Sequence, residues 1–192
     1  MRRRLPTFAL AALAACSSAA RQEEPMLSWH DRALEATTAE KVGTVAPGSP
    51  EEAAAVAAFK DYWSSFTPDV VRAKAPKLYA EDAWFDDTVK SLRGSDKIAH
   101  YMAESAAGAE SCVVELEDWS RKGPDFYMRW KMHIEFKKFK KGELTSSIGL
   151  THLRFNKEGR IVYHQDYWDS ARGLWEHVPV LGWMIRKLKA RI

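Results

Sequence analysis

The sequence predicts an α+β fold in which a curved antiparallel sheet wraps around helices on one of its sides. Helical signals dominate the first half of the chain, and from residue 111 onward apolar and polar residues alternate with the period of two that is typical of strands. The predicted order is α-α-β-α-β-β-β-β, with a further helix at the C-terminal end. With 192 residues, of which 46% are hydrophobic, we expect one domain with appendages.

The first helix of this domain is predicted to begin at residue 50. Ser49 is the expected N-cap, Pro50 occupies the first helical position and Glu52 the third, which together form a capping box. The large apolar side chains that follow recur at helical spacing and predict one buried aromatic face: Val56, Phe59, Tyr62, Trp63 and Phe66.

Two more helices and a short strand are predicted before the sheet proper. A helix over residues 69–79 contains Pro76, which we expect to interrupt it, and leads into an extended segment over residues 83–89. Ser95 is the expected N-cap of a third helix over residues 96–106, which ends near Gly108.

Four strands follow in the second half of the chain. The clearest covers residues 126–137, where large apolar residues occupy every even position, so that one face of the strand is expected to be buried. The other strands are expected over residues 111–119, 144–155 and 160–167. Residues 173–192 are expected to form a C-terminal helical extension, with a break at Pro179 and a last helix over residues 181–192.

The N-terminal end predicts export. Three arginines precede an apolar run, residues 5–15, that has the length of a signal-peptide core and is too short to span a bilayer as a helix. The run ends in Leu-Ala-Ala-Cys, which resembles the lipobox of bacterial lipoproteins and implies that Cys16 becomes the lipidated first residue. The alternative is an ordinary signal peptide cleaved near Ala19 or Ala20, with Cys16 discarded.

On the lipoprotein reading, residues 1–15 are removed and the protein is held at the periplasmic face of the cell envelope. Residues 16–48 mix small, polar and proline residues and are expected to form a tether with a short helix over residues 29–40. The chain has 29 basic and 26 acidic residues, and the signal carries three arginines and no acid, so the mature protein is near neutral. This balance gives no reason to expect binding of nucleic acid.

Two stretches carry a family resemblance: LYAEDAWFDDTVKSLRGSDKIAHYM, which begins at Leu78, and GRIVYHQDYWD, which begins at Gly159. They resemble the nuclear transport factor 2-like superfamily and its SnoaL-like branch, related to ketosteroid isomerases and polyketide cyclases, and the domain is assigned to residues 49–172. The resemblance implies a cone-like fold whose pocket, in different members, holds steroids, polyketides, epoxides, a protein loop or nothing. It does not settle the activity.

The resemblance also implies candidate catalytic residues. Asp87 matches the general base of the isomerases, with Thr88 where they have proline, and Tyr62 or its neighbour Trp63 falls near the position of their oxyanion donor. SnoaL-like cyclases use an acidic pocket residue, so His164 paired with Asp166 or Asp87 is a further candidate; the alternative for His164 and Asp166 is a solvated pair.

The expected pocket wall is aromatic. No cofactor is expected, because the sequence has no Gly-rich phosphate loop, and no metal is expected, because none of the six histidines has ligand spacing to cysteine or acidic residues. His152 could face the pocket or be a core histidine with satisfied hydrogen bonds. Cys112 is expected to be a small buried apolar side chain on a strand. The predicted pocket residues are Phe59, Trp63, Trp84, Trp130, His152 and Trp168.

Three functions remain open at this point. The first is a binding or accessory module for a small hydrophobic ligand; the second is an isomerase, cyclase or dehydratase with Asp87 as base; the third is an interaction domain that forms a homodimer through the outer sheet face. The last helix has an apolar stripe with Trp183 and four basic residues. It could lie on an anionic membrane or dock on its own domain.

Overall fold

The computed structural model describes residues 26–138 and 141–192. The predicted signal, the lipobox and Cys16 lie outside the described residues.

The first half of the described chain contains helices α1 (Met26–Ala36), α2 (Ala39–Val42), α3 (Pro50–Trp63) and α4 (Pro68–Leu78), strands β1 (Tyr79–Asp86) and β2 (Ser91–Arg93), and helix α5 (Ser95–Gly108). Four strands follow: β3 (Ala109–Lys122), β4 (Asp125–Phe136), β5 (Thr145–Phe155) and β6 (Ile161–Trp168). The C-terminal extension consists of α6 (Ser170–Gly173), the 3₁₀ turn η1 (Trp175–His177) and α7 (Leu181–Lys189).

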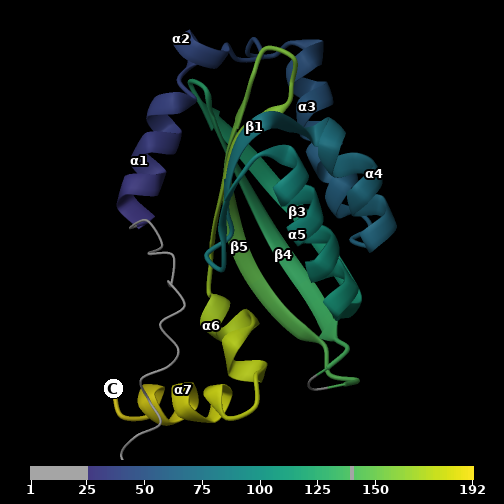
Figure 1. The fold of residues 1–192 in the computed structure, drawn as a ribbon, viewed down its shortest axis with the longest axis vertical. Coiled ribbons are helices and arrows are strands. Elements are labelled where there is room, and N and C mark those ends of the chain that lie inside the picture. Colours follow the sequence, from purple (N-terminus) through teal and green to yellow (C-terminus); the bar gives the residue numbers. More distant parts are fainter. Residues whose placement is uncertain (1–25, 139–140) are drawn as a thin grey trace, which may run out of the picture.

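The predicted α+β architecture is confirmed. Six strands form one sheet in the order β2-β1-β6-β5-β4-β3, and helices α3, α4 and α5 lie on one face of it (Figure 1). The sheet is antiparallel except at one seam, where β1 runs parallel to β6. Strands β3 and β4 are the longest pair, and the residues at the far end of β4 are only half-buried.

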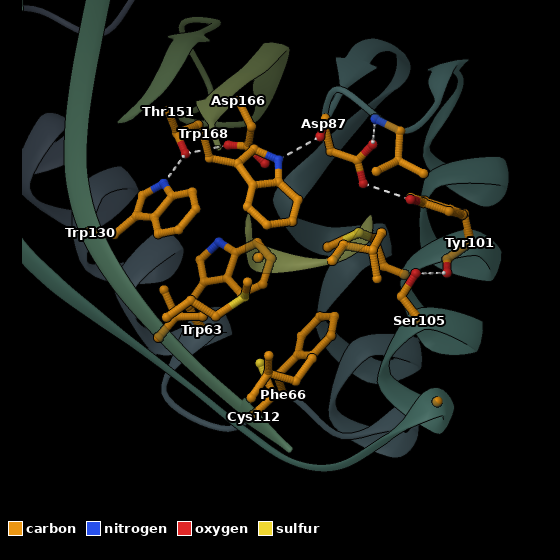
Figure 2. A pocket seen from close by; sticks show the side chains of 18 of the residues that line it. Trp63, Phe66, Asp87, Tyr101, Ser105, Cys112, Trp130, Thr151, Asp166 and Trp168 are labelled. Atoms are coloured by element: carbon orange, nitrogen blue, oxygen red, sulfur yellow. Dashed lines mark hydrogen bonds between the residues drawn. The ribbon is translucent and has the colours of Figure 1, made fainter. Parts of the chain in front are cut away.

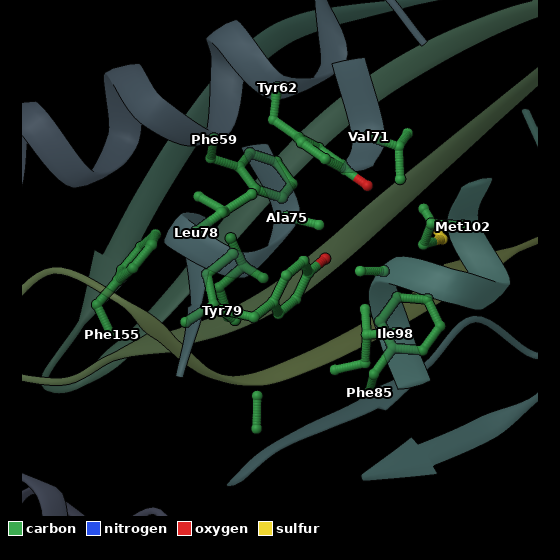
Figure 3. Packing of buried hydrophobic residues seen from close by; sticks show 14 of the residues in the cluster. Phe59, Tyr62, Val71, Ala75, Leu78, Tyr79, Phe85, Ile98, Met102 and Phe155 are labelled. Carbon is green, nitrogen blue, oxygen red and sulfur yellow. The ribbon is translucent and has the colours of Figure 1, made fainter. Parts of the chain in front are cut away.

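The core fills the space between the three helices and the sheet (Figure 3). Ser49 accepts a hydrogen bond from the backbone N–H of Glu52 at 3.1 Å, as the capping pattern predicts, and α3 turns Phe59 and Tyr62 into the core. Pro76 lies inside α4 without ending it. On β4, Phe126, Met128 and Trp130 are buried, whereas the apolar residues beyond them are only half-buried.

Several predicted details are wrong. Strand β1 ends at Asp86 rather than at residue 89, because the side chain of Asp87 accepts hydrogen bonds from the backbone N–H groups of Val89 and Lys90 and forms a turn. Helix α5 has Gly94 at its N-cap position and begins at Ser95, which makes no side-chain cap hydrogen bond. The last helix ends at Lys189 rather than at residue 192.

The predicted tether is packed onto the domain from residue 26 onward. Helix α1 lies on the face of the sheet opposite α3–α5, where Trp29 meets the Trp84 ring at 4.7 Å and His30 contacts the Tyr163 hydroxyl at 2.8 Å (Figure 1). Arg154 donates to the carbonyl oxygen of Leu34 at 2.8 Å. The sheet is therefore covered in part on both faces, which a single-sided layout does not predict.

The C-terminal extension leaves the sheet and ends in α7, which packs on η1. Within the two described stretches of the chain, none of the helices has the length and apolarity needed to cross a bilayer.

Candidate functional site

A cavity of about 340 Å³ opens between the sheet and the helices (Figure 2). Its wall is formed by side chains from α3, α5, β3, β4 and the end of β6, and most of them are aromatic or aliphatic. The half-buried ends of β3 and β4 contribute Val114, Leu116, Met132 and Ile134. The volume is within the range of small-molecule sites in proteins.

Trp63, Trp130 and Trp168 line this cavity, as predicted, together with Phe59. Two of these indole rings occupy space that a side chain would fill if the neighbouring glycine were any larger residue. A Cβ on Gly149 would lie 2.2 Å from the Trp130 ring, and one on Gly173 would lie 2.3 Å from the Trp168 ring. These contacts fix the rings by shape, since any larger residue would displace them.

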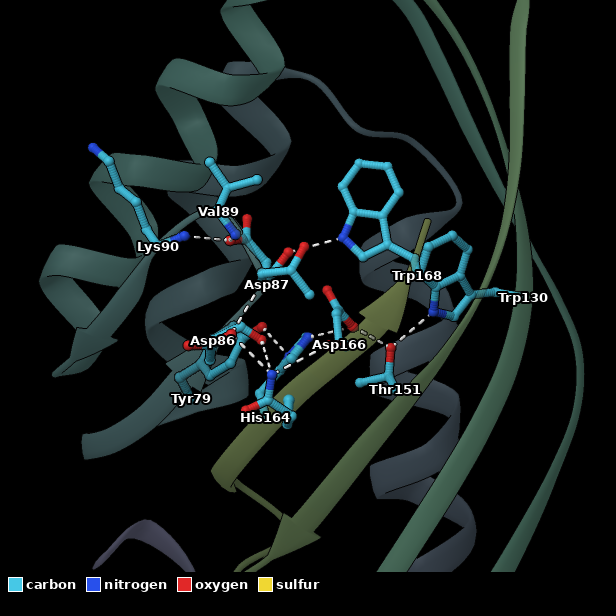
Figure 4. A network of polar contacts seen from close by, with 12 residues as sticks. Tyr79, Asp86, Asp87, Val89, Lys90, Trp130, Thr151, His164, Asp166 and Trp168 are labelled. Atoms are coloured by element: carbon cyan, nitrogen blue, oxygen red, sulfur yellow. Dashed lines mark hydrogen bonds and ion pairs between the residues drawn. The ribbon is translucent and has the colours of Figure 1, made fainter. Parts of the chain in front are cut away.

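Asp87 lines the cavity from the turn after β1. Its carboxylate accepts hydrogen bonds from two backbone N–H groups and, at 2.6 Å, from the Tyr101 hydroxyl on α5 (Figure 4 shows the turn). Burial raises the pKa of Asp87; these hydrogen bonds oppose the rise, and the charge of Asp166 adds to it. Thr88 has φ of 70°, a region that proline, fixed near about −65°, cannot adopt. The backbone conformation of this turn therefore differs from that of a turn with proline at the position of Thr88.

Asp86 does not line the cavity and is nevertheless buried. By strand alternation it faces away from Asp87. Gln165 on β6 donates to it at 2.8 Å, the Thr88 N–H donates at 2.9 Å, and the Ser91 hydroxyl donates as well. The carboxylate thus joins the end of β1 to both neighbouring strands.

Asp166 also lines the cavity, and it terminates a chain of polar contacts that begins in the core (Figure 4). The Tyr79 hydroxyl lies 2.9 Å from His164 Nδ1, and His164 Nε2 lies 3.1 Å from Asp166 Oδ1. Burial raises the pKa of Tyr79 well above its ordinary value, so it keeps its proton. A neutral imidazole satisfies the chain: the tyrosine donates to Nδ1, and Nε2–H donates to the carboxylate.

His164 itself is fully buried between Tyr79 and Phe85 and does not line the cavity. It contacts Asp166, as predicted, and the pair is not a solvated one. Because His164 contacts Asp166 from the core and does not reach the cavity, it orients that carboxylate and is a positioning residue. On the cavity side, the Thr151 hydroxyl donates to the same oxygen of Asp166, and Trp130 Nε1 donates to Thr151 at 2.9 Å.

The structure does not bring Tyr62 to the site. Tyr62 is buried in the core, where burial raises its pKa and its hydroxyl has no hydrogen-bond partner among the described residues (Figure 3). Of these two neighbours, Trp63 is the one that lines the cavity.

The predictions that Trp84 and His152 line the pocket are also wrong, because both side chains lie on the opposite face of the sheet. Trp84 packs against Trp29 of α1. His152 stacks on Tyr127 and contacts Asp125 at 2.7 Å, so it is a satisfied histidine rather than a pocket residue.

Two functional candidates escaped the sequence reasoning. Tyr101 and Thr151 each contact one of the cavity carboxylates, but they come from α5 and β5, far from Asp87 and Asp166 in sequence. Their only local signal is a polar group on an otherwise apolar face. Cys112 also lines the cavity; burial raises the pKa of its thiol to about 12, so it contributes to the apolar wall.

The donors around the cavity are largely engaged. Trp168 Nε1 donates to the backbone carbonyl of Asp87 at 2.8 Å, and Trp130 and Tyr101 donate as described above. The site thus offers apolar surface and two half-buried carboxylates, those of Asp87 and Asp166. No cluster of three or more histidine, cysteine or acidic side chains suited to a metal ion occurs in residues 26–138 and 141–192.

The family model described as SnoaL-like domain matches residues 56–164. No curated protein matches the chain significantly. Among solved structures, a protein with a ketosteroid isomerase-like fold from Catenulispora acidiphila, in complex with trimethylamine, is 21% identical, with a TM-score of 0.54 over 62% of this chain and 88% of that one.

Two further solved structures have the same fold. An LEH-like epoxide hydrolase from M. tuberculosis is 14% identical, with a TM-score of 0.53 over 76% of this chain and 100% of that one. An NTF2-like protein of unknown function from an Exiguobacterium species is 16% identical, with a TM-score of 0.51 over 60% and 98% of the two chains. At these identities the likeness establishes the fold alone.

The contact between Tyr101 and Asp87 predicts a titration effect. In Tyr101→Phe the pKa of Asp87 should rise further, because a hydrogen bond that stabilises the charged carboxylate is lost. A raised carboxyl pKa makes stability fall as pH increases from the ordinary to the raised value, so the variant should extend this fall to higher pH. An NMR titration of the Asp87 carboxyl carbon measures the shift.

Tyr127→Phe, on the other face of the sheet, is the control. An unchanged or lowered pKa of Asp87 in Tyr101→Phe would contradict the assignment of this hydrogen bond.

Proposed function

The chain belongs to the SnoaL-like domain family, and on this premise we propose that it is an exported protein that binds a small hydrophobic molecule in its cavity without turning it over. The observation that carries the proposal is the cavity of about 340 Å³ whose wall is mostly apolar and includes three tryptophan side chains. Apolar enclosure with few polar groups is typical of small-molecule binding sites.

Binding without turnover is favoured over catalysis by the state of the donors. An isomerase or cyclase needs a hydrogen-bond donor aimed at the oxygen where negative charge develops. Here the hydroxyl of Tyr101 and the indole N–H groups of Trp130 and Trp168 all donate to protein acceptors.

Filling the cavity tests the binding proposal. Val114→Trp places an indole in the cavity and should reduce binding of the neutral dye N-phenyl-1-naphthylamine at least about tenfold, measured by fluorescence titration. Val113→Trp is the matched control, because Val113 is the next residue on β3 and is exposed on the other face. Equal loss in both variants, or no binding by the wild-type protein, would contradict the proposal.

A second function, acid/base catalysis, is favoured by one observation: Asp87 lies in an apolar cavity that raises its pKa toward the working range of a general base. As an enzyme, the protein should speed exchange of the protons next to the carbonyl of 2-tetralone for deuterium, followed by NMR. Asp87→Asn should then abolish the acceleration, while Asp82→Asn, on the exposed part of β1, should leave it intact. No acceleration by the wild-type protein removes this alternative.

We further propose that the protein is held at a membrane by a lipid on Cys16 and by α7. Most apolar side chains of α7 are exposed: Trp183 is 58% exposed and Leu188 is 64% exposed. Arg186, Lys187 and Lys189 lie on the same short helix, a combination that suits an anionic lipid surface. The homodimer stays a prediction.

Vesicle flotation tests the role of α7. With the N-terminal segment kept identical, Trp183→Ala combined with Leu188→Ala should reduce binding to vesicles that contain phosphatidylglycerol, because it removes the side chains expected to insert. Trp119→Ala, which removes an exposed tryptophan of β3, should not. Equal binding of all three proteins would exclude α7 as a membrane contact, and Cys16→Ala should separately release the protein from cell membranes.

A further inference from the structure

We propose that the hydrophobic molecule held in the cavity carries a positive charge, as a protonated amine on a compact apolar body, and that its ammonium group binds Asp166. This inference rests on the proposed binding function and names the chemical class of the ligand. It is carried by the charges inside the cavity, by the free oxygen of Asp166 and by the aromatic faces around it.

The inner part of the cavity is negatively charged. Asp87 and Asp166 both line it and are only partly accessible, whereas the other two charged lining residues, Glu104 and Lys138, are exposed and of opposite sign. Among the described residues, no lysine or arginine forms an ion pair with Asp87 or Asp166. The charge of Asp166 also contributes to the raised pKa of Asp87, which means that the two carboxylates repel each other across the site.

A ligand that fills the cavity must displace water from these carboxylates. A neutral apolar ligand would leave both with less solvation and no compensating charge, which is unfavourable. A ligand with an ammonium group compensates the lost solvation by charge attraction and hydrogen bonding. An anionic ligand would add to the repulsion.

The geometry of Asp166 indicates where the ammonium group binds. Its Oδ1 accepts hydrogen bonds from both Thr151 and His164, so this oxygen is engaged on the protein side. Its Oδ2 has no donor among the described residues and is the acceptor left for a ligand. The three hydrogen bonds to Asp87, by contrast, engage both of its oxygens, so Asp87 contributes charge rather than a free acceptor.

The aromatic side chains suit the same cation. The rings of Trp130 and Trp168 lie 6.4 Å apart at an angle of 52°, and both of their N–H groups are turned to protein acceptors (Figure 2). These indoles therefore expose ring carbons to the cavity, and the faces of the rings carry partial negative charge. Trp63 stacks on Phe66 at 5.0 Å and extends this wall. Cations bind such faces, and tryptophan is the strongest partner.

Three probes that share one rigid cage test the charge directly: adamantan-1-amine, adamantan-1-ol and adamantane-1-carboxylate. They differ in the charge of a single polar group. At neutral pH the amine should bind the full-length protein at least about tenfold more tightly than the alcohol, and the carboxylate should bind most weakly, measured by isothermal titration calorimetry. Val114→Trp should weaken all three.

Asp166→Asn is the decisive variant, because asparagine keeps an Oδ1 acceptor for Thr151 and His164 and replaces only Oδ2 with a donor. It should remove most of the preference for the amine while the affinity for the alcohol stays within about threefold. Asp82→Asn is the matched control on an exposed acid and should change neither.

The outcomes separate the inference from the proposed function. If the alcohol binds the wild-type protein as tightly as the amine, or if Asp166→Asn leaves the preference intact, the inference is overturned and hydrophobic binding stands. If none of the probes binds, the proposed function itself fails. The comparison of three probes on the wild-type protein decides the charge even if Asp166→Asn does not fold.

Discussion

The buried carboxylate of Asp86 is the constraint on which the site depends. It accepts hydrogen bonds from Gln165 on β6, from the Ser91 hydroxyl on β2 and from the Thr88 N–H in the turn between β1 and β2. These contacts hold the end of β1 in the parallel seam with β6 and close the turn after it. Because successive side chains alternate across a strand, fixing Asp86 on one side delivers Asp87 to the other, where the cavity lies. The same seam brings His164 and Asp166 beside Asp87.

The cavity lies where strands β3 and β4 face helices α3 and α5 without packing closely against them. Residues of all four elements line it, and the apolar residues at the far end of β4 are only half-buried because they border this cavity. Gly149 and Gly173 let the Trp130 and Trp168 rings come close to the backbone. The result is a largely apolar chamber with two half-buried carboxylates, in which an unpaired charge is costly.

Local patterns predicted the fold well, and long-range contacts account for the rest. The alternation of β4 and the cap at Ser49 depend on neighbours in sequence, so they could be found there. The parallel pairing of β1 with β6, and the α1 helix over Trp84, depend on contacts between distant segments and could not. In the site, family resemblance predicts Asp87 and Asp166, strand alternation predicts Trp130 and Trp168, and helical spacing predicts Trp63. Tyr62, Trp84 and His152 were misplaced because a one-residue difference on a helix or strand turns a side chain to another face. Tyr101 and Thr151 were missed, since their role depends on partners from other elements.

The central claim is that a small apolar molecule binds among the tryptophans of the cavity. Fluorine NMR of protein labelled with 5-fluorotryptophan tests this claim residue by residue, because the chain has 8 tryptophans, each assignable by substitution. On addition of adamantan-1-amine, the resonances of Trp63, Trp130 and Trp168 should shift together, while those of the exposed Trp119 and Trp183 should stay in place. Shifts confined to Trp119 or Trp183 would show binding at the surface and contradict the account.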